Sequence, residues 1–171
     1  MADRIFEPEI SRSLRHVQAK CGHLLKKNLA FECKKVTVPY LSFDRVKDHQ
    51  VQALLEFESK PFYRKLVVGQ LPGKKRGRFQ SETPFDYLYV RCGYSYLLVN
   101  FRFTQKSPRK DLPKGLNRCF AVRIGEFLEG EAQVSPRKSL PYEWFVENGI
   151  ELSRMKVEKG YGWDLSPLFE I

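Results

Sequence analysis

The sequence lacks a long apolar run, since none of its hydrophobic stretches approaches the roughly 20 residues that a helix needs to cross a bilayer. The first residues, Met1 to Arg4, also lack the charged-then-apolar pattern of a secretory signal peptide. No segment of the chain repeats another. We therefore expect a protein that neither spans a membrane nor is exported, with a cytoplasmic location.

Paired cysteines are missing as well. The four cysteines, Cys21, Cys33, Cys92 and Cys119, are irregularly separated and form no C-x-x-C motif. Zinc sites and disulfide frameworks normally show regular spacing. The sequence therefore predicts neither, and reduced thiols are the simpler interpretation.

Acidic residues are outnumbered, with 20 Asp and Glu against 30 Lys and Arg, which gives a net charge of +10. A cationic surface attracts polyanions, and nucleic acid is the commonest of these. The alternative is that the charge serves only solubility. With 171 residues, 42% hydrophobic and 13% aromatic, we expect a single globular domain over 1–171.

Helical and strand-like segments alternate along the chain. An apolar stripe after Pro8 predicts a first helix, and Ser42 or Asp44 is expected to cap a second that runs to about Glu58. Strands are expected at 29–38, 85–90, 94–103 and 119–124, the second and third forming a hairpin or meander with 94–103 central in the sheet. A short helix at 142–148 and an aromatic tail at 160–165 that packs back onto the domain complete an α/β fold, a mixed β-sheet flanked by helices.

A carboxylate and an ammonium lie one residue apart in the first of these strands, at Glu32 and Lys34. Side chains alternate across a strand, so these two share one face. Gln50 on the following helix can point toward the same sheet edge, whereas its neighbour His49 points about 100° away. The alternative is the polar face of a half-exposed strand, and Glu58-Ser59-Lys60 shows that the same spacing also arises by chance.

A second acid, Asp86, stands at the start of an apolar strand, where a charge is costly unless it is solvated or liganded. It could equally cap a turn after Pro84. Carboxylates that hold one or two Mg²⁺ or Mn²⁺ ions can support phosphodiester hydrolysis, and a nearby lysine can orient water and share the transition-state charge. The pattern predicts Glu32 and Asp86 as metal ligands and Lys34 as their electrostatic partner.

Together these residues resemble the PD-(D/E)XK nuclease superfamily, most closely Holliday junction resolvases of the RecU type and related phage and archaeal proteins. The resemblance covers about residues 28–104 and is carried by Phe31-Glu32-Cys33-Lys34, Leu41-Ser42-Phe43, Val46-Lys47-Asp48-His49-Gln50 and Ala53-Leu54. It implies a restriction-endonuclease-like core over about 5–125, followed by a C-terminal helix and tail over about 135–171.

The likeness also implies an activity and roles for residues. The protein would be a magnesium- or manganese-dependent endonuclease for branched DNA and would act as a homodimer. The cell in which it acts would be a phage- or virus-infected host. Glu32 would bind metal, Lys34 would be catalytic and Gln50 would support them. A glutamate of the first helix, Glu7 or Glu9, would join the site; we favour Glu9, although its position near the helix N-terminus is also explained by the helix dipole.

One residue that the resemblance requires is missing. The metal-binding Asp of the family precedes the E-x-K strand, and this chain has no Asp between Asp3 and Asp44. Our hypothesis is that Asp86 supplies this ligand from a later strand.

Basic residues outside the site are expected to grip a phosphate backbone, or else to be solvated charges of loops. The candidates are Lys74, Lys75, Arg76, Arg78, Arg137 and Lys138. Three alternative functions stay open: a nuclease for flaps, ends or single strands, a non-catalytic nucleic-acid-binding protein with a degenerate site, and a basic protein–protein adaptor.

Overall fold

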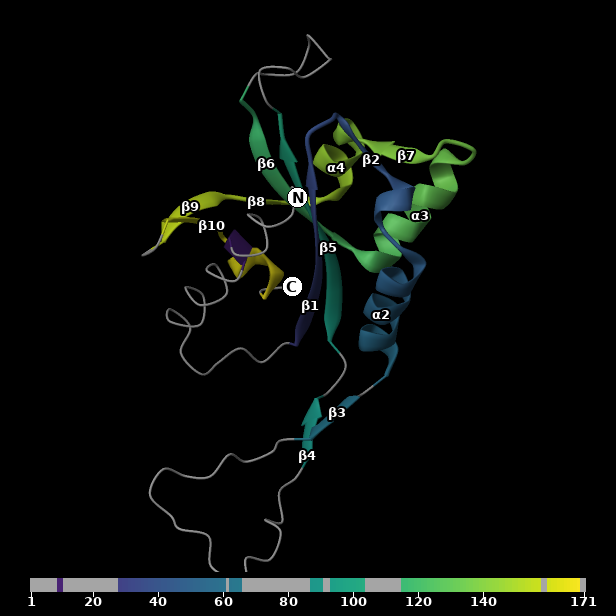
Figure 1. Cartoon of the computed structure of the whole chain (residues 1–171), viewed down its shortest axis with the longest axis vertical. Coiled ribbons are helices and arrows are strands. Elements are labelled where there is room, and N and C mark those ends of the chain that lie inside the picture. Colours follow the sequence, from purple (N-terminus) through teal and green to yellow (C-terminus); the bar gives the residue numbers. More distant parts are fainter. Residues whose placement is uncertain are drawn as a thin grey trace, which may run out of the picture.

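The fold is known from a computed structural model that describes residues 9–10, 28–60, 62–65, 87–90, 93–103, 115–157 and 160–169. Its centre is a four-stranded mixed sheet of order β1-β5-β6-β8 (Figure 1). The strands are β1 (Leu29–Val36), β5 (Tyr94–Arg102), β6 (Asn117–Arg123) and β8 (Ile150–Leu152). β1 runs parallel to β5, whereas β6 runs antiparallel to both β5 and β8. The predicted α/β class with a mixed sheet is therefore confirmed.

The central strand β5 is apolar on both of its faces. Leu97, Val99 and Phe101 point into one hydrophobic cluster, while Tyr96 and Leu98 point into a second cluster on the other face. All five are fully buried. Such a continuous apolar run is what a strand covered on both faces requires, so the prediction that this strand is central is confirmed.

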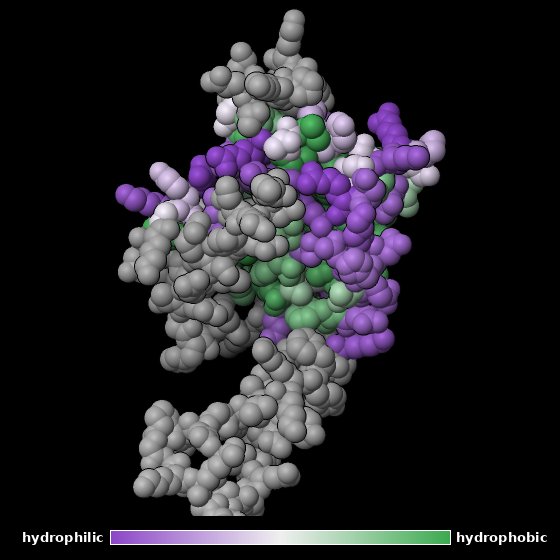
Figure 2. Space-filling model, viewed as in Figure 1, coloured by the Kyte–Doolittle hydropathy of each residue, from purple (hydrophilic) through white to green (hydrophobic). Residues whose placement is uncertain are grey.

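Helices cover the first face of the sheet. They are α2 (Asp48–Ser59), α3 (Ile124–Val134) and α4 (Tyr142–Asn148), and their buried side chains join the first cluster. The outward surfaces of α2 and α3 are hydrophilic (Figure 2). The short strands β2 (Tyr40–Ser42) and β7 (Ser139–Pro141) pair with each other at one end of this layer.

The close packing of α3 on α4 depends on one glycine. A Cβ atom at Gly130 would lie 2.4 Å from the ring of Trp144. Any side chain at this position would therefore separate the two helices.

The second face is covered by the C-terminal segment. The antiparallel ribbon of β9 (Arg154–Val157) and β10 (Gly160–Trp163) leads into the 3-10 helix η3 (Ser166–Leu168). Trp163, Leu165 and Leu168 are buried against this face together with Ile10. The prediction that the aromatic tail packs back onto the domain is confirmed.

Three expectations about the elements need correction. Of the two predicted caps, Ser42 precedes only a 3-10 helix, η2 (Phe43–Arg45), and Asp44 lies within it, whereas α2 begins later, at Asp48. β4 (Tyr87–Val90) forms no hairpin with β5 but pairs with the unpredicted strand β3 (Phe62–Lys65). Helix α3 was also not predicted, because Gly125 and Gly130 weaken its helical signal.

Helices long and apolar enough to cross a membrane are not found in the described ranges.

Arg118 ties β6 to β8 and α4. Its guanidinium donates to both carboxylate oxygens of Glu151 and to the hydroxyl of Tyr142. The guanidinium also lies 5.1 Å from the centre of the Phe120 ring. The Arg118 hydrogen bonds lower the pKa of the Glu151 carboxyl below its usual value.

We expect Phe101→Ala to lower the free energy of unfolding by about 3–5 kcal/mol, because a fully buried aromatic ring would leave a cavity. Phe101 meets the rings of Tyr142 and Phe145 at centroid distances of 5.2 Å. Urea unfolding followed by circular dichroism measures the change. Tyr40→Ala, at a site 46% exposed, is the control and should change stability by no more than about 0.5 kcal/mol. Equal effects of the two substitutions would contradict this assignment of the core.

We also expect the contribution of Glu151 to stability to depend on pH. A carboxyl with a lowered folded-state pKa stabilises the fold above its unfolded value of 4.5, and this contribution is lost as the pH falls through the folded pKa. Urea midpoints of wild type and Glu151→Gln should therefore differ more at pH 7 than at about pH 3. A constant difference would contradict the proposed ion pair.

Candidate functional site

Glu32 and Lys34 lie on the face of β1 that is covered by α2. The alternation of the strand places Ala30 and Val36 against the first hydrophobic cluster, and Phe31 and Cys33 against the second. Glu32 and Lys34 belong to the first set, as the sequence predicts. The Lys34 ammonium lies 2.8 Å from Oε1 of Glu32.

Gln50, in the first turn of α2, completes a cluster with these two residues. Its Nε2 donates a hydrogen bond to Oε1 of Glu32 at 2.8 Å, and its Oε1 accepts a hydrogen bond from Lys34 Nζ at 2.9 Å. The three side chains are thus joined pairwise, from a strand and from the helix that follows it. We call these residues the Glu32–Lys34–Gln50 cluster.

The side chain at position 50 both accepts and donates hydrogen bonds, which an amide can do and a carboxylate cannot. Gln50 Oε1 also accepts the backbone N–H of Lys47 at 3.1 Å, which caps the start of α2. Its nitrogen meanwhile donates to Glu32, and a carboxylate has no proton to donate there. One side chain therefore both begins the helix and orients the acid. Sequence reasoning missed this capping role of Gln50, although Gln at the third helical position is a known capping signal.

Both contacts to Glu32 reach the same oxygen. Gln50 donates a hydrogen bond to Oε1 and the Lys34 ammonium pairs with it, while Oε2 has no hydrogen bond to the described part of the chain. The side chain of Glu32 is 25% exposed and that of Lys34 is 12% exposed. A carboxylate that is held through one oxygen, with the other open to a ligand, can bind a hard cation or accept a proton from a substrate.

Lys34 keeps donor capacity as well. An ammonium has three protons, and the contacts with Glu32 and Gln50 use two of them. The third can be donated to an anionic oxygen. Because Lys34 is largely shielded from water, such a bond would be stronger than one at an exposed lysine.

The structure brings only some of the predicted site residues together. Glu32, Lys34 and Gln50 meet, and His49 is exposed, as expected for a neighbour that points away. Arg137 and Lys138 are exposed in the turn between α3 and β7. The remaining predicted residues lie outside the described residues: Asp86, Lys74, Lys75, Arg76 and Arg78.

The prediction that Glu9 joins this site is wrong. Glu9 is 8% exposed and accepts a hydrogen bond from Nε1 of Trp163 at 3.2 Å. Trp163 and Ile10 both belong to the second hydrophobic cluster, on the sheet face opposite α2. The sheet therefore separates Glu9 from Glu32, and the indole of Trp163 is a hydrogen-bond donor to this acid.

The second E-x-K pair of the chain has a structural role. Glu58 Oε1 accepts the backbone N–H of Ser95 at 2.8 Å, at the end of the sheet where β6 turns into α3. Its carboxylate also lies 3.9 Å from Arg123. Lys60 is 69% exposed and pairs with Glu56. Glu58 thus satisfies the backbone N–H of Ser95, the second residue of β5.

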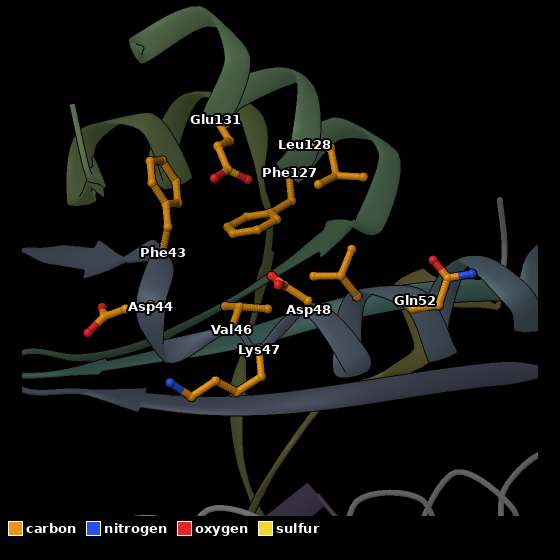
Figure 3. A pocket seen from close by; sticks show the side chains of 10 residues that line it. Phe43, Asp44, Val46, Lys47, Asp48, Gln52, Phe127, Leu128 and Glu131 are labelled. Carbon is orange, nitrogen blue, oxygen red and sulfur yellow. The ribbon is translucent and has the colours of Figure 1, made fainter. Parts of the chain in front are cut away.

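A pocket of about 490 Å³ lies between α2 and α3 (Figure 3). Phe127 and Val46 form apolar walls, while Asp48 and Glu131 point into it from the two helices. Asp44 adds a third acid, whose pKa is lowered, chiefly by a hydrogen bond with Ser42. Three carboxylates would repel phosphates.

A divalent metal fits the cluster in part. The open oxygen of Glu32 is the hard donor that Mg²⁺ and Mn²⁺ prefer. Within the described ranges, however, no group of three or more His, Cys, Asp or Glu side chains converges. A metal site at Glu32 therefore needs a further ligand.

Comparisons of the chain with protein-family models, with curated proteins and with solved structures found no match.

Proposed function

We propose that this protein is a metal-dependent endonuclease that hydrolyses phosphodiester bonds of DNA, built on a restriction-endonuclease-like core. The observation that carries the proposal is the mutual bonding of Glu32, Lys34 and Gln50. A strand supplies an acid and a lysine, and the next helix supplies a glutamine that contacts both of them. This arrangement supports the role assigned to each residue by the resemblance to PD-(D/E)XK nucleases.

The topology around the cluster supports the same proposal. Parallel strands require a crossover connection, and the chain between β1 and β5 contains α2. The crossover brings Gln50 back over β1, where Lys34 and Glu32 share one face. β1 is also an edge strand of the described sheet, which leaves the cluster beside an edge and not in the centre of the molecule.

In the proposed mechanism Glu32 and Asp86 would hold the metal ion, with Asp86 as the further ligand that Glu32 needs. Bound there, the ion would lower the pKa of a coordinated water and neutralise charge on the scissile phosphate. Lys34 uses its remaining N–H to donate a hydrogen bond to a phosphate oxygen and stabilises the negative charge that develops on it. Gln50 holds the side chains of Glu32 and Lys34 in their relative positions, so neither has to reorient when DNA binds.

The proposed substrate is branched DNA, such as a Holliday junction, with the protein acting as a homodimer. The net charge of +10 supports binding to a polyanion. Two symmetric cuts require two sites, which a twofold dimer would provide. Nucleases for flaps, ends or single strands use the same chemistry, so substrate preference has to be measured separately.

A second candidate is a nucleic-acid-binding protein without catalysis. It is favoured by one specific observation, that the described part of the cluster contains a single carboxylate. Tight binding to DNA without cleavage in Mg²⁺ or Mn²⁺ would support this candidate over the nuclease.

We expect Glu32→Gln and Lys34→Ala each to lower the cleavage rate at least about 100-fold, because each removes charge at the reacting phosphate. Gln50→Ala should cost about 10–100-fold, since it loosens the other two residues. The assay is cleavage of labelled four-way junction, duplex and single-stranded DNA in Mg²⁺, Mn²⁺ or EDTA. Lys60→Ala removes a lysine at the same E-x-K spacing and is the matched control, with an unchanged rate. Full activity of Lys34→Ala would contradict the proposed site.

Asp86→Asn tests the second metal ligand. We expect it to abolish cleavage and to weaken Mn²⁺ binding, measured by titration calorimetry, by at least about tenfold. Asp44→Asn, at an acid of the pocket between α2 and α3, is the control and should bind Mn²⁺ like the wild type. If Asp86→Asn cleaved DNA as well as the wild type while Glu32→Gln was inactive, Asp86 would not be the ligand.

A further inference from the structure

The β9–β10 ribbon exposes two cations and an aromatic ring on one face. Lys156 pairs directly with Tyr161 across the ribbon, and Arg154 precedes Lys156 by two residues on the same side of its strand. All three residues are exposed, Tyr161 to 53%. The Arg154 guanidinium lies 4.4 Å from the centre of the Tyr161 ring. We call Arg154, Lys156 and Tyr161 the ribbon face.

The other side of the ribbon packs against the core through Val157, which is 7% exposed. At the end of the ribbon Trp163, which pairs with Arg154, is 1% exposed and donates a hydrogen bond from its indole nitrogen to Glu9. The ribbon face therefore stands on a fixed base. Its tyrosine, Tyr161, is 53% exposed.

The chemistry of this face matches one class of ligand. A planar ring stacks on a nucleobase that is not already stacked in a duplex, and flanking cations bind the phosphates on either side of that base. Arg154 holds the ring and adds a charge next to it. We propose that the ribbon face binds single-stranded DNA, including the unpaired segment of a branched substrate, by stacking one base on Tyr161.

This inference rests on the proposed function for the identity of the ligand as DNA and adds a subsite to it. The ribbon lies on the side of β1 opposite α2 in Figure 1, and its residues belong to neither the Glu32–Lys34–Gln50 cluster nor its contacts. Arg154, Lys156 and Tyr161 are thus binding residues and not catalytic ones. Their loss should raise KM and leave kcat unchanged.

The test is binding of a fluorescent single-stranded DNA of about 20 nucleotides to the full chain, measured by anisotropy in EDTA so that metal-dependent cleavage does not occur. We expect Tyr161→Ala to weaken binding about tenfold or more, and Tyr161→Phe to bind like the wild type because it keeps the ring. Tyr40→Ala, at another exposed tyrosine, is the matched control and should bind normally. Thermal unfolding of each variant verifies that the fold is retained.

The cations are tested through the salt dependence of the same binding. Each phosphate contact contributes about 0.7 to the slope of log K against log salt for a single strand. Arg154→Gln combined with Lys156→Gln should therefore reduce the slope by about 1.4. Lys60→Gln removes one exposed cation elsewhere and should leave it unchanged.

Two results would overturn the inference: wild-type affinity of Tyr161→Ala, or a loss in Tyr161→Phe equal to that in Tyr161→Ala. Tighter binding of a blunt duplex than of the single strand would do so too, because a duplex offers no unstacked base. Cleavage in Mg²⁺ separates the two proposals. Normal binding by the ribbon variants with wild-type cleavage would remove the subsite and leave the nuclease, whereas impaired binding in a chain that never cleaves DNA would leave the subsite and remove the nuclease.

Discussion

The parallel pairing of β1 with β5 is the constraint on which the rest of the structure depends. Parallel neighbours cannot be joined by a tight turn, so the chain must leave the sheet and return, and α2 lies in that connection. The pairing fixes which side chains of β1 face α2, because a register shift by one residue would send Glu32 and Lys34 to the opposite face. The same pairing makes β5 central, which explains why its two faces are both apolar.

Gln50 contributes both to the start of α2 and to the Glu32–Lys34–Gln50 cluster. Its carbonyl oxygen accepts from the Lys47 amide and from Lys34, and its amide nitrogen donates to Glu32. The start of a helix and the geometry of the Glu32–Lys34–Gln50 cluster thus depend on one side chain. Such shared use makes the cluster rigid, since any change in the position of the helix end would be transmitted to both charged groups.

The parts of the fold that depend on local chemistry could be predicted from the sequence. The helix Tyr142–Asn148 lies between Pro141 and Gly149, and strand alternation alone places Glu32 beside Lys34. The parts decided by distant contacts could not be predicted. Gly130 weakens the helical pattern of α3, and Trp144 occupies the space that a side chain at this position would need. The partner of β4 is β3. Glu9 accepts its hydrogen bond from Trp163, which is at the other end of the chain.

The separation of β1 and β5 along the sequence also has a kinetic consequence. Leu29 pairs with Tyr94, so the pairing closes a loop that contains α2, β3 and β4. The entropy of closing this loop is lost before the paired strands gain their contacts, and chains dominated by such contacts fold in milliseconds to seconds rather than microseconds. Until β5 docks, β1 has no partner on that side and the face that presents Glu32 and Lys34 has no sheet behind it. A partly synthesised chain that ends before Tyr94 would therefore carry every residue of the Glu32–Lys34–Gln50 cluster without the sheet that supports it.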